Sequence, residues 1–485
     1  MRSWVWLAAV ACSPDHPNRS TGGPPPPAPD TGSPIAAPPV LVAATCSLQA
    51  ENVLRADCTL SVSPPAAVEV SFAPTQGDIA PRLSQSEALS AEHSLTAYGM
   101  VADTEYAWTA RPTGHPESKI RGTWRTGSLP TNADISFLTT GSSTSPDDLA
   151  FLFNCGLNPQ AVVADAAGRI VWYQALDKGL PGKRLNAQAL TFTPERTFLA
   201  TLARGVVREY DLSGHLLLDL QLEEGDFDRP VHHDLFRRGD YTYVLNAHTG
   251  EYGDGDVYVT DGVYVFDRSG VQQALFDLDS VLTPGGGGFP GGYWSETFPL
   301  DAIDYSHGNG IFVDEEGMMY LSFYHLDTIL KVDGDPTRSS FGSVELVFQG
   351  SPLSPFDRSD VVLTSSLGVT TDLTFEAQHC PSFLSDGRFM LFDNERSGSS
   401  RVLTMRLDEA AGTADIDGSY SMNATCAFEG GALEMSNGNL LGTCAPARRF
   451  NEFEPGNPTA IRTVSPICAV PFGFAILPRG IPIRL

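Results

Sequence analysis

Positive charge is scarce in this chain. Lysine and arginine together number 31, against 58 aspartates and glutamates, which gives a formal net charge of -27. A nucleic-acid backbone is bound by clustered lysine and arginine side chains. The composition therefore excludes nucleic acid as an expected partner. Small anionic substrates stay compatible with it, because a single pocket can be positive on an acidic protein.

Long apolar runs are also missing. No segment approaches the ~20 apolar residues that a membrane-spanning helix needs. The first residues, MRSWVWLAAVAC, combine one arginine, a short apolar run and small residues before Cys12. This pattern predicts a lipoprotein-type signal peptide over residues 1–11, with Cys12 acylated, and an ordinary cleaved signal is the alternative. We expect an exported bacterial lipoprotein in the periplasm or at the outer membrane or cell surface, with the lipid anchor as its only membrane contact.

Cysteines number only eight. Export to an oxidising compartment predicts that they form disulfides. If Cys12 is lipidated, seven remain, so at least one lies outside an intramolecular pair. Cys46 with Cys58, and Cys426 with Cys444, are close enough in sequence to link neighbouring strands. Cys155 with Cys468 could join the two ends of a large domain.

Helical periodicity is nearly absent, whereas glycine and proline number 46 and 36. Residues 12–40 are rich in proline, glycine, serine and threonine, which predicts an extended tether. Alternating segments over residues 41–129 predict a small, fibronectin-like β-sandwich in which Tyr106 occupies a tyrosine corner. Nothing in this segment indicates catalysis.

Residues 134–485 repeat one pattern, an apolar run, an Asp/Asn turn with glycine, and a second apolar run. Such turns predict β-hairpins, because Gly and Asn tolerate the positive φ of tight turns. Six instances at intervals of roughly 45 to 70 residues are typical of blades arranged around an axis. We predict an all-β fold with a six-bladed β-propeller, although one blade could contribute two such turns. The six segments are VVADAAGRIVWY, REYDLSGHLLLDL, VYVFDRSGVQQALFDL, GIFVDEEGMMYLSF, SFLSDGRFMLFD and LEMSNGNLLGTC.

Histidines number ten, and six of them lie between residues 232 and 379. Each cluster stands beside a predicted strand of a different blade, so the propeller would bring them to one central opening. Several imidazoles could bind a transition metal. Alternatively, one imidazole could attack an electrophilic sulfur or phosphorus atom while its neighbours stabilise the charged oxygens. His232 and His233, as neighbours on a strand, are expected to point to opposite faces.

Four motifs together resemble the bacterial arylsulfate sulfotransferase family from about Phe137 to the C-terminus. They are His-His-Asp, Asp-Tyr-Ser-His-Gly-Asn, Ser-Phe-Tyr-His-Leu-Asp-Thr-Ile, and Gln-His with Phe-Asp-Asn downstream. The resemblance implies an exported six-bladed propeller that moves a sulfuryl group from an aryl sulfate to a phenol through a sulfated histidine. It implies no nucleotide donor, no metal and no cofactor. The expected partners are the aryl sulfate donor and the phenolic acceptor, and homodimer formation is left open.

The resemblance also assigns roles to single residues. His379 matches the nucleophile, and His307 and His233 match the histidines around the sulfate, with His232 as the alternative to His233. Asn309 is expected to bind substrate, and Arg401 is expected to form a structural ion pair.

One position departs from the family, which usually has arginine where this chain has Tyr324. A tyrosine hydroxyl donates one hydrogen bond but carries no charge, and losing such a donor costs about 2 to 4 kcal/mol of transition-state stabilisation. By strand alternation, His325 is expected to lie opposite Tyr324. The departure favours a rival hypothesis, in which a surface-tethered propeller binds a ligand or a protein partner without turnover.

Overall fold

The computed structural model describes residues 37–77, 79–153, 159–180, 187–202, 204–286, 288–290, 292–352, 354–368, 373–395, 398–468 and 480–485. The predicted signal peptide with Cys12, most of the predicted tether, and Cys155 lie outside these residues. The predicted domain boundaries stay predictions. Within the described part of the chain, no helix combines the length and the apolar character that crossing a membrane requires.

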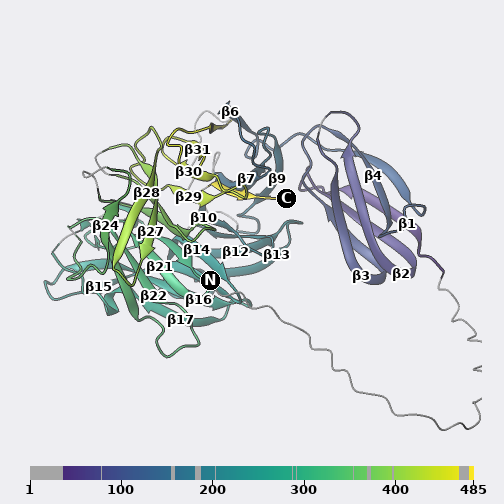
Figure 1. The fold of residues 1–485 in the computed structure, drawn as a ribbon. Coiled ribbons are helices and arrows are strands. Elements are labelled where there is room, and N and C mark those ends of the chain that lie inside the picture. Colours follow the sequence, from purple (N-terminus) through teal and green to yellow (C-terminus); the bar gives the residue numbers. More distant parts are fainter. Residues whose placement is uncertain are drawn as a thin grey trace, which may run out of the picture. The chain divides into compact units, whose positions relative to one another are not determined.

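The segment after the tether forms one five-stranded antiparallel sheet (Figure 1). Strand β2 pairs with β1, β3 and β4, and its buried side chains face a core that contains Phe72, Tyr106 and Trp124. The Tyr106 hydroxyl accepts a hydrogen bond from the backbone N–H of Val101 at 2.9 Å, as a tyrosine corner requires. The fibronectin-like assignment stays a prediction. The strands are β1 (Val40–Leu48), β2 (Ala56–Pro74), β3 (Arg82–Ala97), β4 (Glu105–Pro112) and β5 (Ile120–Arg125).

The remaining strands of the described residues form six sheets. The first sheet contains β10 (Ala187–Phe192), β11 (Thr197–Leu202), β12 (Val206–Asp211) and β13 (Leu216–Gln221). The second contains β14 (Val231–Arg238), β15 (Tyr241–Glu251), β16 (Val257–Asp267), β17 (Gln272–Asp277), β18 (Phe289–Pro290) and β19 (Ile303–Asp304). The third contains β20 (Gly308–Val313), β21 (Met318–Phe323), β22 (Thr328–Asp333) and β23 (Val344–Gln349). Three short 3₁₀ helices accompany them, η1 (Leu222–Glu224), η2 (Leu278–Ser280) and η3 (Gly292–Trp294).

The fourth sheet contains β24 (Val362–Ser365), β25 (His379–Phe383), β26 (Phe389–Asp393), β27 (Arg401–Asp408) and β28 (Thr413–Ser421). The fifth and sixth sheets each combine strands from both ends of this region. The fifth joins β6 (Ile135–Gly141) to β29 (Gly431–Glu434), β30 (Leu440–Cys444), β31 (Arg449–Phe453) and β32 (Arg462–Cys468). The sixth joins β33 (Gly480–Ile483) to β7 (Asp148–Phe153), β8 (Gln160–Ala164) and β9 (Ile170–Ala175).

One edge strand of each sheet contacts the corresponding edge strand of the next sheet, and we call these the innermost strands. They follow one another in cyclic order, β10, β14, β20, β25, β29, β33 and back to β10. A separate apolar core fills the space between each neighbouring pair of sheets. Strands with cores on both sides have few polar positions, and all six residues of β11 are buried. The sheets therefore close into a ring, which is the arrangement that a β-propeller requires.

All six predicted hairpins are present, one in each sheet of the ring, at the turns β8–β9, β12–β13, β16–β17, β20–β21, β25–β26 and β29–β30. Gly387 illustrates their chemistry, because its φ of 85° lies in the left-handed region that side chains disfavour. The predicted disulfides Cys46–Cys58 and Cys426–Cys444 are confirmed. They are consistent with an exported protein.

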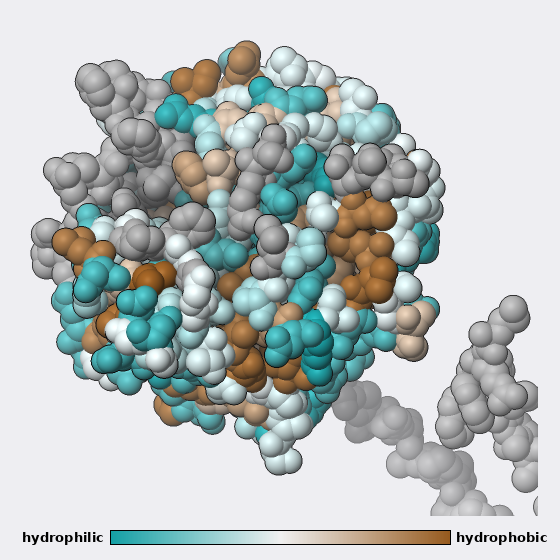
Figure 2. Space-filling view, turned by 90° about the vertical axis from the view of Figure 1, so that its left-hand side faces the viewer, coloured by the Kyte–Doolittle hydropathy of each residue, from teal (hydrophilic) through white to brown (hydrophobic). Residues whose placement is uncertain are grey.

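The surface of the ring is mixed in character. Figure 2 shows hydrophobic residues in separate patches among hydrophilic ones on one face. Such scattered apolar patches are ordinary on soluble proteins and need no partner to explain them.

Candidate active site

Three histidines from separate sheets meet where the innermost strands begin. His233 lies near the start of β14, His307 just before β20, and His379 opens β25. The ring centroids of His233 and His307 are 4.7 Å apart. The Tyr324 ring contacts both His307, at 5.4 Å, and His379, at 5.8 Å. Residues that are distant in the sequence therefore converge around one opening.

The expectation that His232 and His233 point to opposite faces is wrong. Their Nδ1 atoms lie only 2.9 Å apart. His233 has a φ of 49°, and the pairing of β14 with β15 shifts register between Val231 and Leu235. A left-handed residue breaks the alternation of a strand, so both imidazoles turn toward one another.

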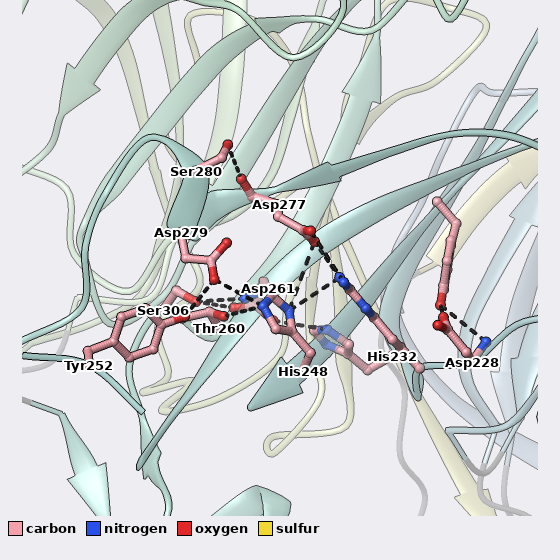
Figure 3. A network of polar contacts seen from close by, with 12 residues as sticks. Asp228, His232, His248, Tyr252, Thr260, Asp261, Asp277, Asp279, Ser280 and Ser306 are labelled. Carbon is pink, nitrogen blue, oxygen red and sulfur yellow. Dashed lines mark hydrogen bonds and ion pairs between the residues drawn. The ribbon is translucent and has the colours of Figure 1, made fainter. Parts of the chain in front are cut away.

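A buried carboxylate holds His232 in place. His232 is fully buried, and its Nε2 lies 3.0 Å from Oδ1 of Asp261 (Figure 3). The other oxygen of Asp261 accepts hydrogen bonds from the Ser306 hydroxyl and the Gly308 N–H. Burial alone would raise the pKa of Asp261, but His232 and these donors outweigh it and lower that pKa. Asp261 thus stays ionised and joins the second sheet to the third.

The surroundings of His233 and His307 shift the pKa values of the two imidazoles in opposite directions. The pKa of His233 is far below its usual value because it is buried and faces His307 and other positive groups. His307 is also buried, but its Nδ1 lies 2.6 Å from Oδ2 of Asp304. The charge of Asp304 and this hydrogen bond outweigh burial and raise the pKa of His307. The pKa values of two neighbouring imidazoles are therefore shifted in opposite directions, which is the pattern of an acid and a base held in one site.

The expectation that His325 lies opposite Tyr324 is also wrong. Both rings contact His307, and they lie 5.3 Å from one another. Strand β21 ends at Phe323, so both residues belong to a turn, where alternation does not apply. The Nδ1–H of His325 donates to the Asp304 carbonyl at 3.0 Å. Burial and the positive His307 lower the pKa of His325 to about 4.

The Tyr324 hydroxyl donates to the backbone carbonyl of Ala427 at 2.7 Å. Its proton is therefore used within the protein, while its ring lines the opening between His307 and His379. Tyr324 contributes an aromatic wall and a link to the loop between β28 and β29. It does not replace the charge of the arginine that the family usually carries at this position.

The tautomer of His379 is set by its surroundings. His379 is 4% exposed, and its Nδ1 lies 2.8 Å from Oδ1 of Asn394 and 3.1 Å from the Ala377 carbonyl. The Asn394 amide nitrogen donates to the carbonyls of Cys426 and Glu429, at 2.6 and 2.8 Å, so its oxygen must face the histidine. Two oxygens around Nδ1 require a proton there, so the neutral form of His379 has its lone pair on Nε2.

Two further predicted residues have structural contacts. The Asn309 amide nitrogen donates to the Gln378 carbonyl at 2.8 Å, next to His379 in the chain, so Asn309 links β20 to β25. Arg401 pairs with the buried Asp393 at 2.9 Å and donates to the Thr374 carbonyl. The prediction of a structural ion pair for Arg401 is confirmed.

Sequence reasoning missed an aromatic and cationic group beside the histidines. The Arg204 guanidinium lies 4.1 Å from the ring centroid of Tyr293 and 4.9 Å from that of Trp294. The Tyr293 ring in turn contacts His233 at 4.7 Å and His307 at 5.0 Å. The only sequence signal for it was the aromatic pair after a glycine-rich loop.

Among the residues that the structure describes, two clusters could bring ligand atoms to a metal ion, and the ligand atoms within each cluster lie within 4.8 Å of one another. The first is Asp304 with His307 and His325. The second is His248 with Asp277 and Asp279, in which Arg229 pairs with Asp277 and Tyr252 donates to Asp279 at 2.6 Å (Figure 3). A guanidinium already balances this second carboxylate pair, so the cluster is explained as an ion-pair network.

The family model for arylsulfotransferases (ASST) matches residues 136–414, which is more than half of the chain. The chain belongs to the arylsulfotransferase family. This membership supports a sulfuryl-transferring enzyme in general, and it favours an enzyme over a binding protein without turnover. No curated protein matches the chain.

Three solved structures that resemble the chain do so at low sequence identity. A protein of unknown function from Bacteroides caccae is 12% identical, with a TM-score of 0.41, covering 70% of this chain and 100% of its own. Virginiamycin B lyase from Staphylococcus aureus is 9% identical, with a TM-score of 0.34, covering 67% and 87%. A putative 6-phosphogluconolactonase from Bacteroides fragilis is 11% identical, with a TM-score of 0.34, covering 87% and 99%. Likenesses at these scores carry no conclusion about function.

Proposed function

We propose that this arylsulfotransferase transfers a sulfuryl group from an aryl sulfate to a phenol through a sulfated His379, in a six-bladed propeller whose blades are the six sheets of the ring. The observation that carries the proposal is the hydrogen bond of 2.8 Å between Nδ1 of His379 and Oδ1 of Asn394. It leaves Nε2 with a lone pair, which is what a nucleophile needs at neutral pH.

The first half-reaction forms an Nε2–S bond on His379 and breaks the bond between sulfur and the aryl oxygen. The ring gains positive charge as the sulfuryl group arrives. The Nδ1–H carries this charge toward the oxygens of Asn394 and Ala377, which stabilise it. His307, whose pKa Asp304 raises, gives its Nε2 proton to the leaving phenolate.

The second half-reaction reverses these events with the acceptor. His307 takes the proton of the phenol as the phenol oxygen attacks sulfur, which restores both histidines. The Nε2 of His232 lies 3.0 Å from the Asp261 carboxylate. A His232 tautomer with its proton on Nε2 leaves Nδ1 to accept from the Nδ1–H of His233, so Nε2 of His233 keeps its lone pair. His233 then accepts a hydrogen bond from the acceptor hydroxyl and orients it.

The missing arginine at position 324 can be compensated by charges that the structure does supply. Protonated His307 offers an N–H donor to the sulfuryl oxygens. Arg204, one aromatic ring away, adds a positive field that also lowers the pKa of His233. The reaction needs no nucleotide and no metal, so each half-reaction uses only side chains of the protein and the two phenolic substrates.

The function is tested with para-nitrophenyl sulfate and phenol. We expect release of nitrophenolate that depends on phenol, with the parallel double-reciprocal plots of a ping-pong reaction. Treatment with a metal chelator should leave the rate unchanged. No release with any of several phenols would refute the transferase and favour the ligand-binding rival.

Asp304→Asn is expected to narrow the active pH range from the alkaline side. The acid form of His307 is present below its pKa and disappears as the pH rises through it. Because Asp304 raises that pKa, the substitution lowers it, and the alkaline limb moves to lower pH. The pH profile of kcat/KM for para-nitrophenyl sulfate measures this limb. An unmoved limb would show that His307 is not the acid.

Tyr324→Phe is expected to change kcat by no more than several-fold, because the hydroxyl donates to Ala427 rather than to substrate. Removing an oxyanion donor would cost about 10²- to 10³-fold in kcat. Steady-state kinetics distinguish the two cases. A loss of the larger size would place the hydroxyl on the sulfuryl group during catalysis.

A further inference from the structure

Glu429 repeats the backbone conformation found at the active-site histidines. Its φ is 53°, compared with 49° for His233 and 52° for His307. All three residues stand within two positions of the start of an innermost strand, and Glu429 precedes β29. Non-glycine residues seldom adopt positive φ, and here three of them stand close to the starts of innermost strands in three sheets of the ring.

Contacts of its backbone tie Glu429 to the nucleophile. Its carbonyl accepts a hydrogen bond of 2.8 Å from the Asn394 amide, and the same side chain binds Nδ1 of His379 at 2.8 Å. The charge of Glu429 also reaches Tyr293. Burial chiefly raises the pKa of Tyr293, Arg204 opposes this, and the negative Glu429 adds to the rise. The backbone of Glu429 therefore lies beside the asparagine that holds His379, and its charge acts on Tyr293, whose ring contacts His233 and His307.

The carboxyl group lacks the partner that its position demands. Its Oε2 is shielded from solvent and has no hydrogen-bond partner among the described residues. Burial raises the pKa of Glu429 to about 7, and no cation among the described residues offsets the effect. A buried carboxylate is costly unless a cation or donor pairs with it. The other buried acids of the site, Asp261 and Asp304, both have such partners.

We propose that Glu429 pairs with an ammonium group on the aryl substrate, so that this arylsulfotransferase prefers phenols that carry a cationic amine. This inference rests on the proposed function, because it names the substrate class of the same site. The rings of Tyr293 and Tyr324 provide aromatic walls for the aryl group. The ammonium neutralises the carboxylate, which would otherwise repel the anionic sulfuryl group.

The test compares two acceptors that differ in one group, para-hydroxybenzylamine and para-hydroxybenzyl alcohol. At about pH 8, where the amine is charged, we expect kcat/KM to favour the amine by at least about tenfold, or ~1.4 kcal/mol. In Glu429→Gln this ratio should fall to about one, and in Glu429→Asp, which keeps the charge, part of it should remain.

Two results would overturn the proposal. One is a ratio near one in the wild type. The other is an undiminished ratio in Glu429→Gln, and if both acceptors lose activity equally in that variant, Glu429 has a proton-transfer role instead. If Glu429→Gln does not fold, the comparison within the wild type still decides. Calorimetric binding of the two acceptors without any sulfate donor separates this proposal from the transferase. Preferential binding of the amine would persist even if no sulfuryl group were transferred.

Discussion

His379→Ala is expected to abolish phenol-dependent nitrophenolate release, with a loss of at least about 10⁴-fold in kcat. In the proposed mechanism, the imidazole of His379 supplies the atom that forms the covalent bond to sulfur. The measurement is initial rate with para-nitrophenyl sulfate and phenol. His215→Ala is the matched control, because His215 is exposed and pairs only with Asp211.

Intact-mass analysis tests the same assignment of the nucleophile without requiring turnover. Wild-type protein exposed to the donor alone should gain the mass of one sulfuryl group, and peptide mapping should place it on His379. His379→Ala should gain nothing, and His215→Ala should behave as the wild type. A sulfuryl group on another residue, or equal rates in His379→Ala and wild type, would refute the assignment of the nucleophile.

Asn394→Leu is expected to lower kcat by about 10²- to 10⁴-fold, because misplacing the tautomer of a catalytic histidine costs up to about 10⁴. Without the amide oxygen, only the Ala377 carbonyl remains near Nδ1, and the proton can move to Nε2. Sulfation of the protein by the donor should slow by the same factor as kcat. A proportionate loss in both would assign Asn394 to the formation of the sulfated histidine.

Asn451→Leu is the control for the structural cost of this change. Asn451 is as buried as Asn394 and also donates to the segment after β28, at the Met422 carbonyl. The hydrogen bond at Nδ1 of His379 is made with Asn394, so Asn451→Leu leaves that bond in place. Asn394→Asp keeps the acceptor oxygen and should retain more activity than Asn394→Leu. If both leucine variants lose equal activity, the effect of Asn394 is only on folding.

The hairpins of the ring were predictable because their signal is local. An aspartate or asparagine followed by glycine fixes a turn wherever it occurs, and the six segments formed one turn in each sheet. The strands that close the ring were not predictable from such signals. β6 pairs with β32, and β33 pairs with β7, across more than 300 residues of sequence, and neither pairing leaves a turn motif between its strands.

The convergence of the three histidines was predictable, but the directions of their side chains were not. The resemblance named His379, His307 and His233, and the ring brings them together. The positive φ of His233 decided where His232 points, and no residue type in the sequence announces it. Arg204 and Glu429 lie in connections outside the four motifs, so only the fold places them beside the histidines. Asn394 was inside the Phe-Asp-Asn motif, yet its role depends on carbonyls that the sequence does not display.

The disulfide between Cys426 and Cys444 has a consequence for when the protein becomes active. Cys426 provides one of the two carbonyls that turn the Asn394 amide toward His379. Until the two thiols are oxidised, this carbonyl belongs to a loop with more freedom, and the lone pair of the nucleophile is less firmly set on Nε2. Under the proposed mechanism, this disulfide would therefore help to orient His379 as well as strengthen the fold.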